Sequence, residues 1–264
     1  MTVAQLYQKL NEMIPPSLSC DWDNDGIMCL PDPDREVRRV LLPLDITEYM
    51  VDLAIAEDYD LIISHHPLLF HGLKHVEPDD PVARRVIKLC RHGVAAFSFH
   101  TRLDALEGGV NDVLSRRLKL QHAVPFGDDG IGRIGTLATP MDAQSFAAMV
   151  ADRLNAPTVT LSDSGRPVHR VAVLGGGGGD EVLSALSAGA DTYVTGEAAH
   201  HWLVDAPERG LSLIVAGHYH TEYLVMEQLA IILDGLLPDA HVLPVNSNTV
   251  KVLFNPRHVA SKGE

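Results

Sequence analysis

Three segments of this 264-residue chain combine histidines with carboxylates at spacings that suit metal ions. The first, LIISHHPLLF at 61–70, is an apolar run that leads directly into His65 and His66. Adjacent side chains on a strand point to opposite faces, but the chain can turn where a strand ends, so that both imidazoles face one cavity. Pro67 favours such a turn because proline cannot extend a hydrogen-bonded ladder. We therefore expect both histidines to bind metal, the alternative being a solvated pair at a strand end.

The second and third segments add carboxylates to these histidines. FSFHTRLDALEGGVND at 97–112 places Asp104 four residues after His100, and IVAGHYHTEYLVMEQLA at 214–230 places Glu222 four residues after His218, on one helical face. A carboxylate offers two oxygens, so Asp104 can bridge two cations, whereas His100 is expected to orient a ligand. The sequence thus predicts two divalent ions per subunit, with zinc, iron, manganese and cobalt not distinguishable, held by His65, His66, Asp104, His218 and Glu222.

Groups that could move protons above such a site occur in YVTGEAAHHWL at 193–203. Glu197 follows a predicted strand there, and His200 and His201 begin a predicted helix. Together with His100, Glu197 and His201 are our candidate catalytic acid–base residues. The alternative for the two adjacent histidines is a structural or subunit-contact role.

These segments require a scaffold, and short apolar runs that alternate with helix-length periodic segments predict an α/β fold. The strands are expected at 39–45, 61–64, 94–99, 133–138, 158–161, 170–174, 192–195, 213–216 and 250–254. The helices are expected at 3–14, 48–57, 82–91, 109–118, 143–154, 180–188 and 221–233. All three histidine-bearing segments follow predicted strands, and ligands in open α/β sheets gather at the carboxyl ends of strands.

The two halves of the chain resemble each other. A shift of about 131 positions aligns 37–40 with 168–171, Asp60 with Asp191, and 61–64 with 192–195. We interpret this as two related α/β units, whose equivalent strands end at His65-His66 and at Gly196-Glu197. The alternative is the general likeness of all βαβ units.

Composition restricts the partners and the compartment. The formal net charge of −14 argues against nucleic acid as a partner, although one local basic pocket could still bind phosphate. The three cysteines are odd in number and lack CxxC spacing, which predicts buried small side chains rather than disulfides or a thiolate zinc site. The sequence has no signal-peptide pattern and no apolar run of the roughly 18 residues that a membrane span needs. We expect a cytoplasmic protein.

Two further motifs remain open at the sequence level. Gly175–Gly179 follows a predicted strand and precedes a helix, where it is either a phosphate site or a flexible loop. No Lys-Ser/Thr pair follows it, and the pattern does not fit a dinucleotide-dependent oxidoreductase. The acidic segment CDWDNDGIMC at 20–29 either lines the site or caps a helix.

The set of motifs resembles a known family. SHHP, HTRLD with GGVND, GRIGTL, GADTYVTGEAAHH, GHYHTE and an N-terminal WDNDG occur in the order seen in the type 2 GTP cyclohydrolase I family, also described as dinuclear-metal-centre hexameric or NGG-interacting-factor-three-like proteins. The resemblance spans roughly residues 20–256. One departure is Asp25, which stands where an apolar residue is expected.

The resemblance implies two intertwined, repeat-related α/β units with a dinuclear metal site in the cleft between them. We expect the first unit at 1–126 plus about 220–264 and the second at 127–219. It also implies a toroidal homohexamer and a metal-activated water that attacks a nucleotide or another small molecule, in the family label the imidazole carbon of guanine with release of formate. The alternative is a non-enzymatic metal-binding scaffold or metal-handling protein, because one fold hosts many functions.

Overall fold

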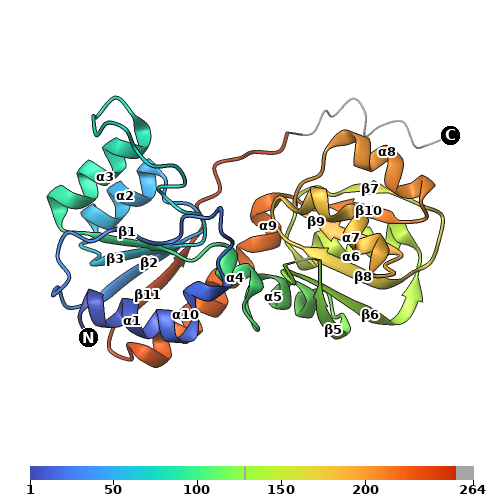
Figure 1. The fold of residues 1–264 in the computed structure, drawn as a ribbon, viewed down its shortest axis with the longest axis horizontal. Coiled ribbons are helices and arrows are strands. Elements are labelled where there is room, and N and C mark those ends of the chain that lie inside the picture. The colour runs from blue at the N-terminus through green and yellow to red at the C-terminus, as the bar shows by residue number, and fades with distance from the viewer. Residues whose placement is uncertain (128, 254–264) are drawn as a thin grey trace.

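The computed structural model describes residues 1–127 and 129–253, which form two lobes, each built on its own β-sheet (Figure 1). The mixed α/β fold expected from the sequence is confirmed. The first sheet has the order β1-β4-β3-β2-β11 and the second the order β5-β6-β8-β9-β10-β7.

The first sheet is built from early strands and one late strand. Its strands are β1 (Gly26–Cys29), β2 (Arg39–Pro43), β3 (Leu61–Ser64), β4 (Ala95–Ser98) and β11 (His241–Val245). All neighbours pair in parallel except β1, which runs antiparallel to β4. Strands β3 and β4 are buried along their whole length, as expected for parallel strands covered on both faces.

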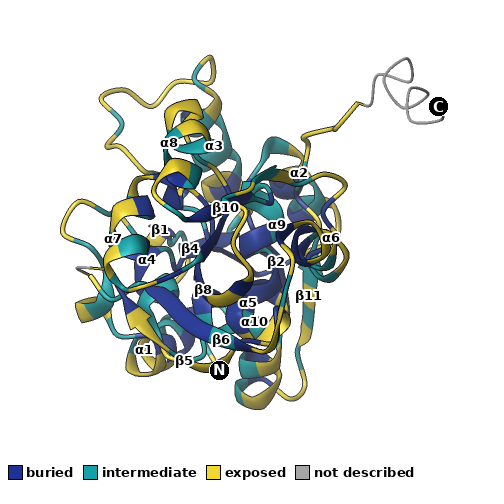
Figure 2. Cartoon of the chain, turned by 90° about the vertical axis from the view of Figure 1, so that its right-hand side faces the viewer, coloured by how far each residue is buried: buried dark blue, intermediate teal, exposed yellow. Residues whose placement is uncertain are grey.

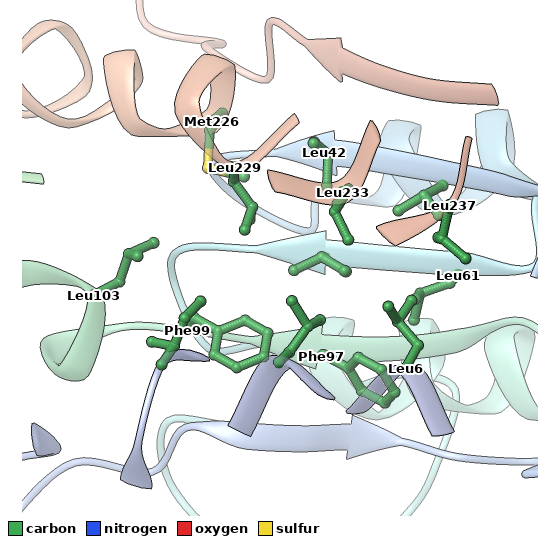
Figure 3. Packing of buried hydrophobic residues seen from close by; sticks show 14 of the residues in the cluster. Leu6, Leu42, Leu61, Phe97, Phe99, Leu103, Met226, Leu229, Leu233 and Leu237 are labelled. Carbon is green, nitrogen blue, oxygen red and sulfur yellow. The ribbon is translucent and has the colours of Figure 1, made fainter. Parts of the chain in front are cut away.

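Helices cover both faces of this sheet. The helices α1 (Val3–Met13) and α10 (Leu224–Leu236) pack on one face, and α2 (Glu48–Ala56) and α3 (Pro81–His92) pack on the other. Figure 3 shows the first of these interfaces, with Leu229 and Leu233 of α10 on the side of Leu42, and Leu6 of α1 on the side of Phe97. A turn of 3-10 helix at Pro16–Leu18 follows α1.

The second sheet uses the middle of the chain. Its strands are β5 (Gln121–Phe126), β6 (Gly132–Met141), β7 (Thr160–Ser162), β8 (Val168–Leu174), β9 (Thr192–Thr195) and β10 (Ser212–Val215). Helices α5 (Val110–Arg117) and α6 (Ala143–Arg153) pack on one face, and α7 (Val182–Ser187) and α8 (His200–Glu208) on the other. Figure 2 shows the resulting burial, with dark strands enclosed by helices whose outer surfaces are exposed. The boundary expected at residue 126 would assign β5 to the first unit, whereas β5 belongs to the second sheet.

The hydrogen bonds support the internal repeat. A carboxylate oxygen of Asp60 accepts from the backbone N–H groups of Arg38 and Arg39, at 2.8 and 2.9 Å. The equivalent oxygen of Asp191 accepts from the backbone of His169 and Arg170, at 3.0 and 2.7 Å. The order β4-β3-β2 also matches β10-β9-β8. In both lobes, an aspartate just before one central strand therefore accepts hydrogen bonds from the backbone at the start of the neighbouring parallel strand.

Some expectations were wrong in detail. Residues 250–253 form no strand, and residue 254 of that prediction lies outside the described residues. The edge strand is instead β11, which contains Pro244. The chain after this strand crosses toward the second lobe (Figure 1). Only Cys29 of the three cysteines is buried; Cys20 is partly exposed, and exposed Cys90 places its Sγ 3.4 Å from that of Cys29. No helix in the described ranges is long and apolar enough to cross a membrane.

Candidate metal centre

The end of β3 holds the histidine pair in a fixed turn. The His66 N–H donates to the carbonyl of Leu44 at 3.0 Å, and the His66 carbonyl accepts from the hydroxyls of Ser64 and Ser98, at 2.7 and 3.2 Å. These bonds extend the hydrogen bonding of the sheet to His66, and the chain turns away from the sheet at Pro67. Both imidazoles consequently face the same region, with ring centroids 5.0 Å apart.

The other predicted ligands come from two short helices. Helix α4 (Thr101–Ala105), which follows β4, carries Asp104. Helix α9 (His218–Glu222), which follows β10, carries His218 and Glu222. Helix α9 lies between the two lobes, beside α4 (Figure 1). The α4 turn was not expected from the sequence, because five residues are too few to show helical periodicity.

These side chains form two groups that share one carboxylate. The ligand atoms of His65, Asp104 and Glu222 lie within 4.8 Å of one another, and so do those of His66, His218 and Glu222. Glu222 uses a different oxygen toward each side: Oε1 is 3.8 Å from His65 Nε2, and Oε2 is 3.0 Å from His66 Nε2. The geometry suits two neighbouring cations bridged by one carboxylate, so these residues could bind metal.

Each of the three histidines is oriented through its other ring nitrogen. His65 Nδ1 lies 2.9 Å from the carbonyl oxygen of Phe99, His66 Nδ1 lies 2.7 Å from Asp45 Oδ1, and His218 Nδ1 lies 3.1 Å from Glu197 Oε1. A carbonyl or carboxylate oxygen only accepts, so each Nδ1 is assigned the proton. All three Nε2 lone pairs are then directed into the cluster, as is usual for metal-binding histidines.

The convergence of acceptors leaves a place for positive charge. His65 Nε2 is buried without a hydrogen-bond partner among the described residues, although it lies 3.6 Å from Asp104 Oδ1. His66 Nε2 and His218 Nε2 lie 3.2 Å apart, and both are acceptors in the assigned tautomer. Buried polar atoms are rarely left unpaired in proteins. A metal ion satisfies this set of atoms, and the residues present therefore fit it.

The ionisation of the cluster shows the same need for cations. Burial lowers the pKa of His66, but hydrogen bonds with Asp45 and Glu222 outweigh it and raise this pKa to about 10. Burial raises the pKa of Asp104 to about 6, against the opposing effect of His65. Burial also acts to raise the pKa of Glu222, but His65 and the hydrogen-bonded histidines hold it well below its usual range. In the metal-free protein, protons take the position of metal ions.

Asp23 and His100 form a pair beside this cluster. His100 Nδ1 lies 2.8 Å from Asp23 Oδ1, and Asp23 Oδ2 accepts from the backbone N–H and the hydroxyl of Thr101, at 3.0 and 2.6 Å. Burial would raise the pKa of Asp23, but the hydrogen bonds from His100 and Thr101 hold it well below its usual range. A ring nitrogen of His100 also lies within 4.8 Å of those of His65 and His66. The acidic segment at 20–29 therefore contacts the site through Asp23, which supports His100 from behind and also accepts from the first N–H of α4.

Asp25, the residue that departs from the family pattern, forms a buried ion pair. Its carboxylate accepts from Arg102 Nε at 2.8 Å, and the side chains of the pair are only 6% and 1% exposed. Arg102 Nη1 also donates to Asn11 Oδ1 and to the Ile14 carbonyl, at 2.7 and 3.1 Å. Arg102 belongs to α4, so the pair fixes the helix that carries Asp104.

The glycine run has a role that the sequence did not suggest. Gly176 has a φ of +62°, and a Cβ built there would lie 1.9 Å from Glu222 Oε1 and 3.0 Å from His218 Nε2. Neither a phosphate site nor a merely flexible loop describes this position. The absence of a side chain lets the backbone pack directly against the shared carboxylate.

A cavity of about 1040 Å³ opens beside the cluster and contacts both lobes. Its walls include His66, His100, Glu197 and His218, and residues 247–250 and Val252 contribute after the chain crosses back. His201 lies elsewhere: it is exposed on α8, with its ring 4.9 Å from that of Trp202, and is not among the lining residues of this cavity that the structure describes. The structure thus brings Glu197 and His100 to the cluster but not His201.

Comparisons with known proteins agree with this architecture. A family model described as Duf34/NIF3 (NGG1p interacting factor 3) matches residues 1–251. A Streptomyces coelicolor protein named "GTP cyclohydrolase 1 type 2 homolog" is 31% identical over 273 residues, covering 98% of this chain and 95% of that protein. A Schizosaccharomyces pombe "Protein NIF3 homolog" is 31% identical, covering 84% and 86%. The crystal structure of a hypothetical protein from Staphylococcus aureus matches with a TM-score of 0.86 at 28% identity, covering 96% and 99%.

Proposed function

The chain belongs to the Duf34/NIF3 family, and from that premise we propose that it is a metal-dependent hydrolase of small molecules, nucleotides among them. The observation that carries the proposal is the convergence of three Nε2 atoms on Glu222, each imidazole being held from behind through Nδ1. His65, Asp104 and Glu222 would hold one divalent ion, and His66, His218 and Glu222 the other. When bound, such ions supply Lewis-acid activation of water and stabilise developing negative charge.

The Asp23–His100 pair is suited to proton transfer. Asp23 accepts the Nδ1 proton of His100, which leaves the lone pair of His100 on Nε2. That nitrogen can accept a proton from water in the cavity and return it to a leaving group, and the Asp23 carboxylate stabilises the charged imidazole meanwhile. Glu197 orients His218 through Nδ1 and lines the cavity, so its role combines ligand positioning with access to a substrate.

The cavity favours catalysis over a scaffold. A storage or structural site has filled, closed coordination, whereas a catalytic site keeps space for a substrate next to the ions. Here about 1040 Å³ of open space adjoins His66 and His218, the two histidines of the more exposed group. Cavities of this size are typical of small-molecule sites.

The test is activity restored by metal. Metal-free protein is reconstituted separately with zinc, iron, manganese and cobalt, and hydrolysis of GTP and of generic phosphoesters is measured. We expect turnover with at least one metal and its loss in His65→Ala, whereas His92→Ala, an exposed histidine of α3, is the matched control. Binding of two ions without turnover on any substrate would contradict the hydrolase and favour the scaffold.

One part of the proposal rests on the family resemblance alone. We place the chain in a toroidal homohexamer with its sites facing an internal cavity, and a monomeric mass in light scattering would contradict this. His201 is not part of the proposal, because its side chain lies on α8 away from the cluster; His201→Ala should therefore keep both metal and turnover.

A further inference from the structure

Arg85 of α3 is half-buried, and its partners differ from those of the buried Arg102 and Arg133. Arg102 and Arg133 each make an ion pair with a carboxylate, with Asp25 and Asp112. Arg85 makes no ion pair among the described residues: its Nε donates to the Pro81 carbonyl at 2.8 Å, and its Nη1 donates to the Ile46 carbonyl at 2.6 Å. Burial lowers the pKa of Arg85, against the opposing effect of the nearby Glu48 carboxylate, so the guanidinium is partly desolvated.

The position of Arg85 connects it to the metal cluster. Arg85 lines the 1040 Å³ cavity and also a side chamber of about 420 Å³, and His66, Pro67, Phe70 and Asp45 line both as well. The side chamber is lined by the loop after β3, by Asp45 and Ile46 before α2, and by α3. A molecule in the main cavity can therefore reach the guanidinium at one end while its other end lies against His66.

The fixed guanidinium is well suited to an oxyanion. The two backbone carbonyls hold Nε and Nη1, and Nη2 has no partner among the described residues. A guanidinium whose rotamer is already fixed loses less entropy on binding, and its planar fork matches carboxylate and phosphate. The chain carries a net charge of −14, so an anionic molecule needs such a local cation to be retained.

We infer that Arg85 is a specificity-determining residue, which binds the carboxylate or phosphate of an anionic small molecule whose reactive part lies at the metal cluster. Phe70, 42% exposed, provides an apolar wall between the two ends. This inference rests on the proposed function for the role of the cluster, but the anion site itself is a binding property that does not require turnover.

The test is anion binding to metal-loaded protein, measured by calorimetry at constant ionic strength with inorganic phosphate and with acetate as probes. Arg85→Gln should weaken binding of the preferred anion about tenfold, the effect of losing a charged hydrogen bond. Arg91→Gln, which removes the same charge from an exposed position of the same helix, should leave it unchanged. Comparison of the two probes identifies phosphate or carboxylate as the group bound.

Two further measurements keep the test decisive. Arg85→Lys retains the charge and should fold even where the glutamine variant does not, yet it should still weaken binding several-fold because lysine lacks the planar fork. Metal-free protein should keep an Arg85-dependent part of the binding, so lack of turnover does not affect the result. Unchanged affinity in Arg85→Lys and Arg85→Gln, an equal loss in Arg91→Gln, or binding that depends on metal alone would overturn the inference.

Discussion

Substitution of Gly176 by alanine should disable the metal cluster without touching a ligand. The new Cβ would lie 1.9 Å from Glu222 Oε1, whereas real Cβ contacts are essentially never under 3.0 Å, so one side must move by about 1.1 Å, the difference between these distances. The glycine backbone is fixed, because its N–H donates to Thr221 Oγ1 at 3.0 Å and its carbonyl accepts from the Glu197 N–H at 2.8 Å. The carboxylate must therefore move, which disturbs the contacts of 3.0 and 3.1 Å that its Oε2 makes with His66 and His218.

The magnitude follows from this displacement. Disturbing the groups that position metal ligands typically costs 10–100-fold in affinity, and a shared ligand puts both subsites at the upper end, about 100-fold or about 2.8 kcal/mol. The left-handed φ adds about 1 kcal/mol of backbone strain, which lowers the free energy of unfolding. The two effects are separate, since the first appears in metal affinity and the second in stability.

The assay is competition with a chelator of known affinity, together with thermal unfolding. Gly177→Ala is the matched control: its Cβ would meet nothing within 4 Å, and its φ of −81° suits alanine. We expect wild-type affinity in the control and the loss only in Gly176→Ala. Equal metal affinity in both variants and the wild type would refute the assignment of Glu222 as the shared ligand.

Three other predictions concern separate parts of the fold. In the metal-free protein the raised pKa of His66 contributes stability that is fully present below its unfolded value of about 6.5 and is lost as the pH rises through about 10. The melting temperature should therefore fall over that interval, and His66→Asn should reduce the fall, the rest coming from His65 and His218, whose pKa values are also raised. Asp25→Ala should lower the free energy of unfolding in urea by about 3 kcal/mol, because it leaves Arg102 buried without its partner; a loss under about 1 kcal/mol would contradict this. Mild oxidation should link Cys29 to Cys90, seen as the loss of two hydrogens by intact mass, whereas Cys90→Ser should stay unchanged.

The sequence predicted the features that depend on local pattern. The apolar runs at 61–64 and 192–195 predicted strands β3 and β9 with the same bounds that the structure has. The i to i+4 spacing of His218 and Glu222 predicted that both lie on one helical face, as they do in α9. The order of motifs indicated the family, which the family model confirms. Convergence at strand ends then followed from the rule for parallel sheets.

What the sequence did not reveal depends on contacts between distant segments. Asp45 and Asp23 orient His66 and His100 across 21 and 77 positions of chain, and no local pattern marks them beyond their acidity. Gly176 packs against a ligand that lies on another element, and β11 pairs with β2 despite a proline. The family pattern leads one to expect an apolar residue at position 25. Asp25 is accommodated there because the buried Arg102 on α4 is its charge partner.

Elemental analysis of reconstituted protein measures whether two metal ions share Glu222. We expect two ions per chain in the wild type and the loss of both in Glu222→Ala, because each group of ligands loses the same carboxylate. Fewer than one ion in the wild type, or two ions still bound after removal of Glu222, would contradict it.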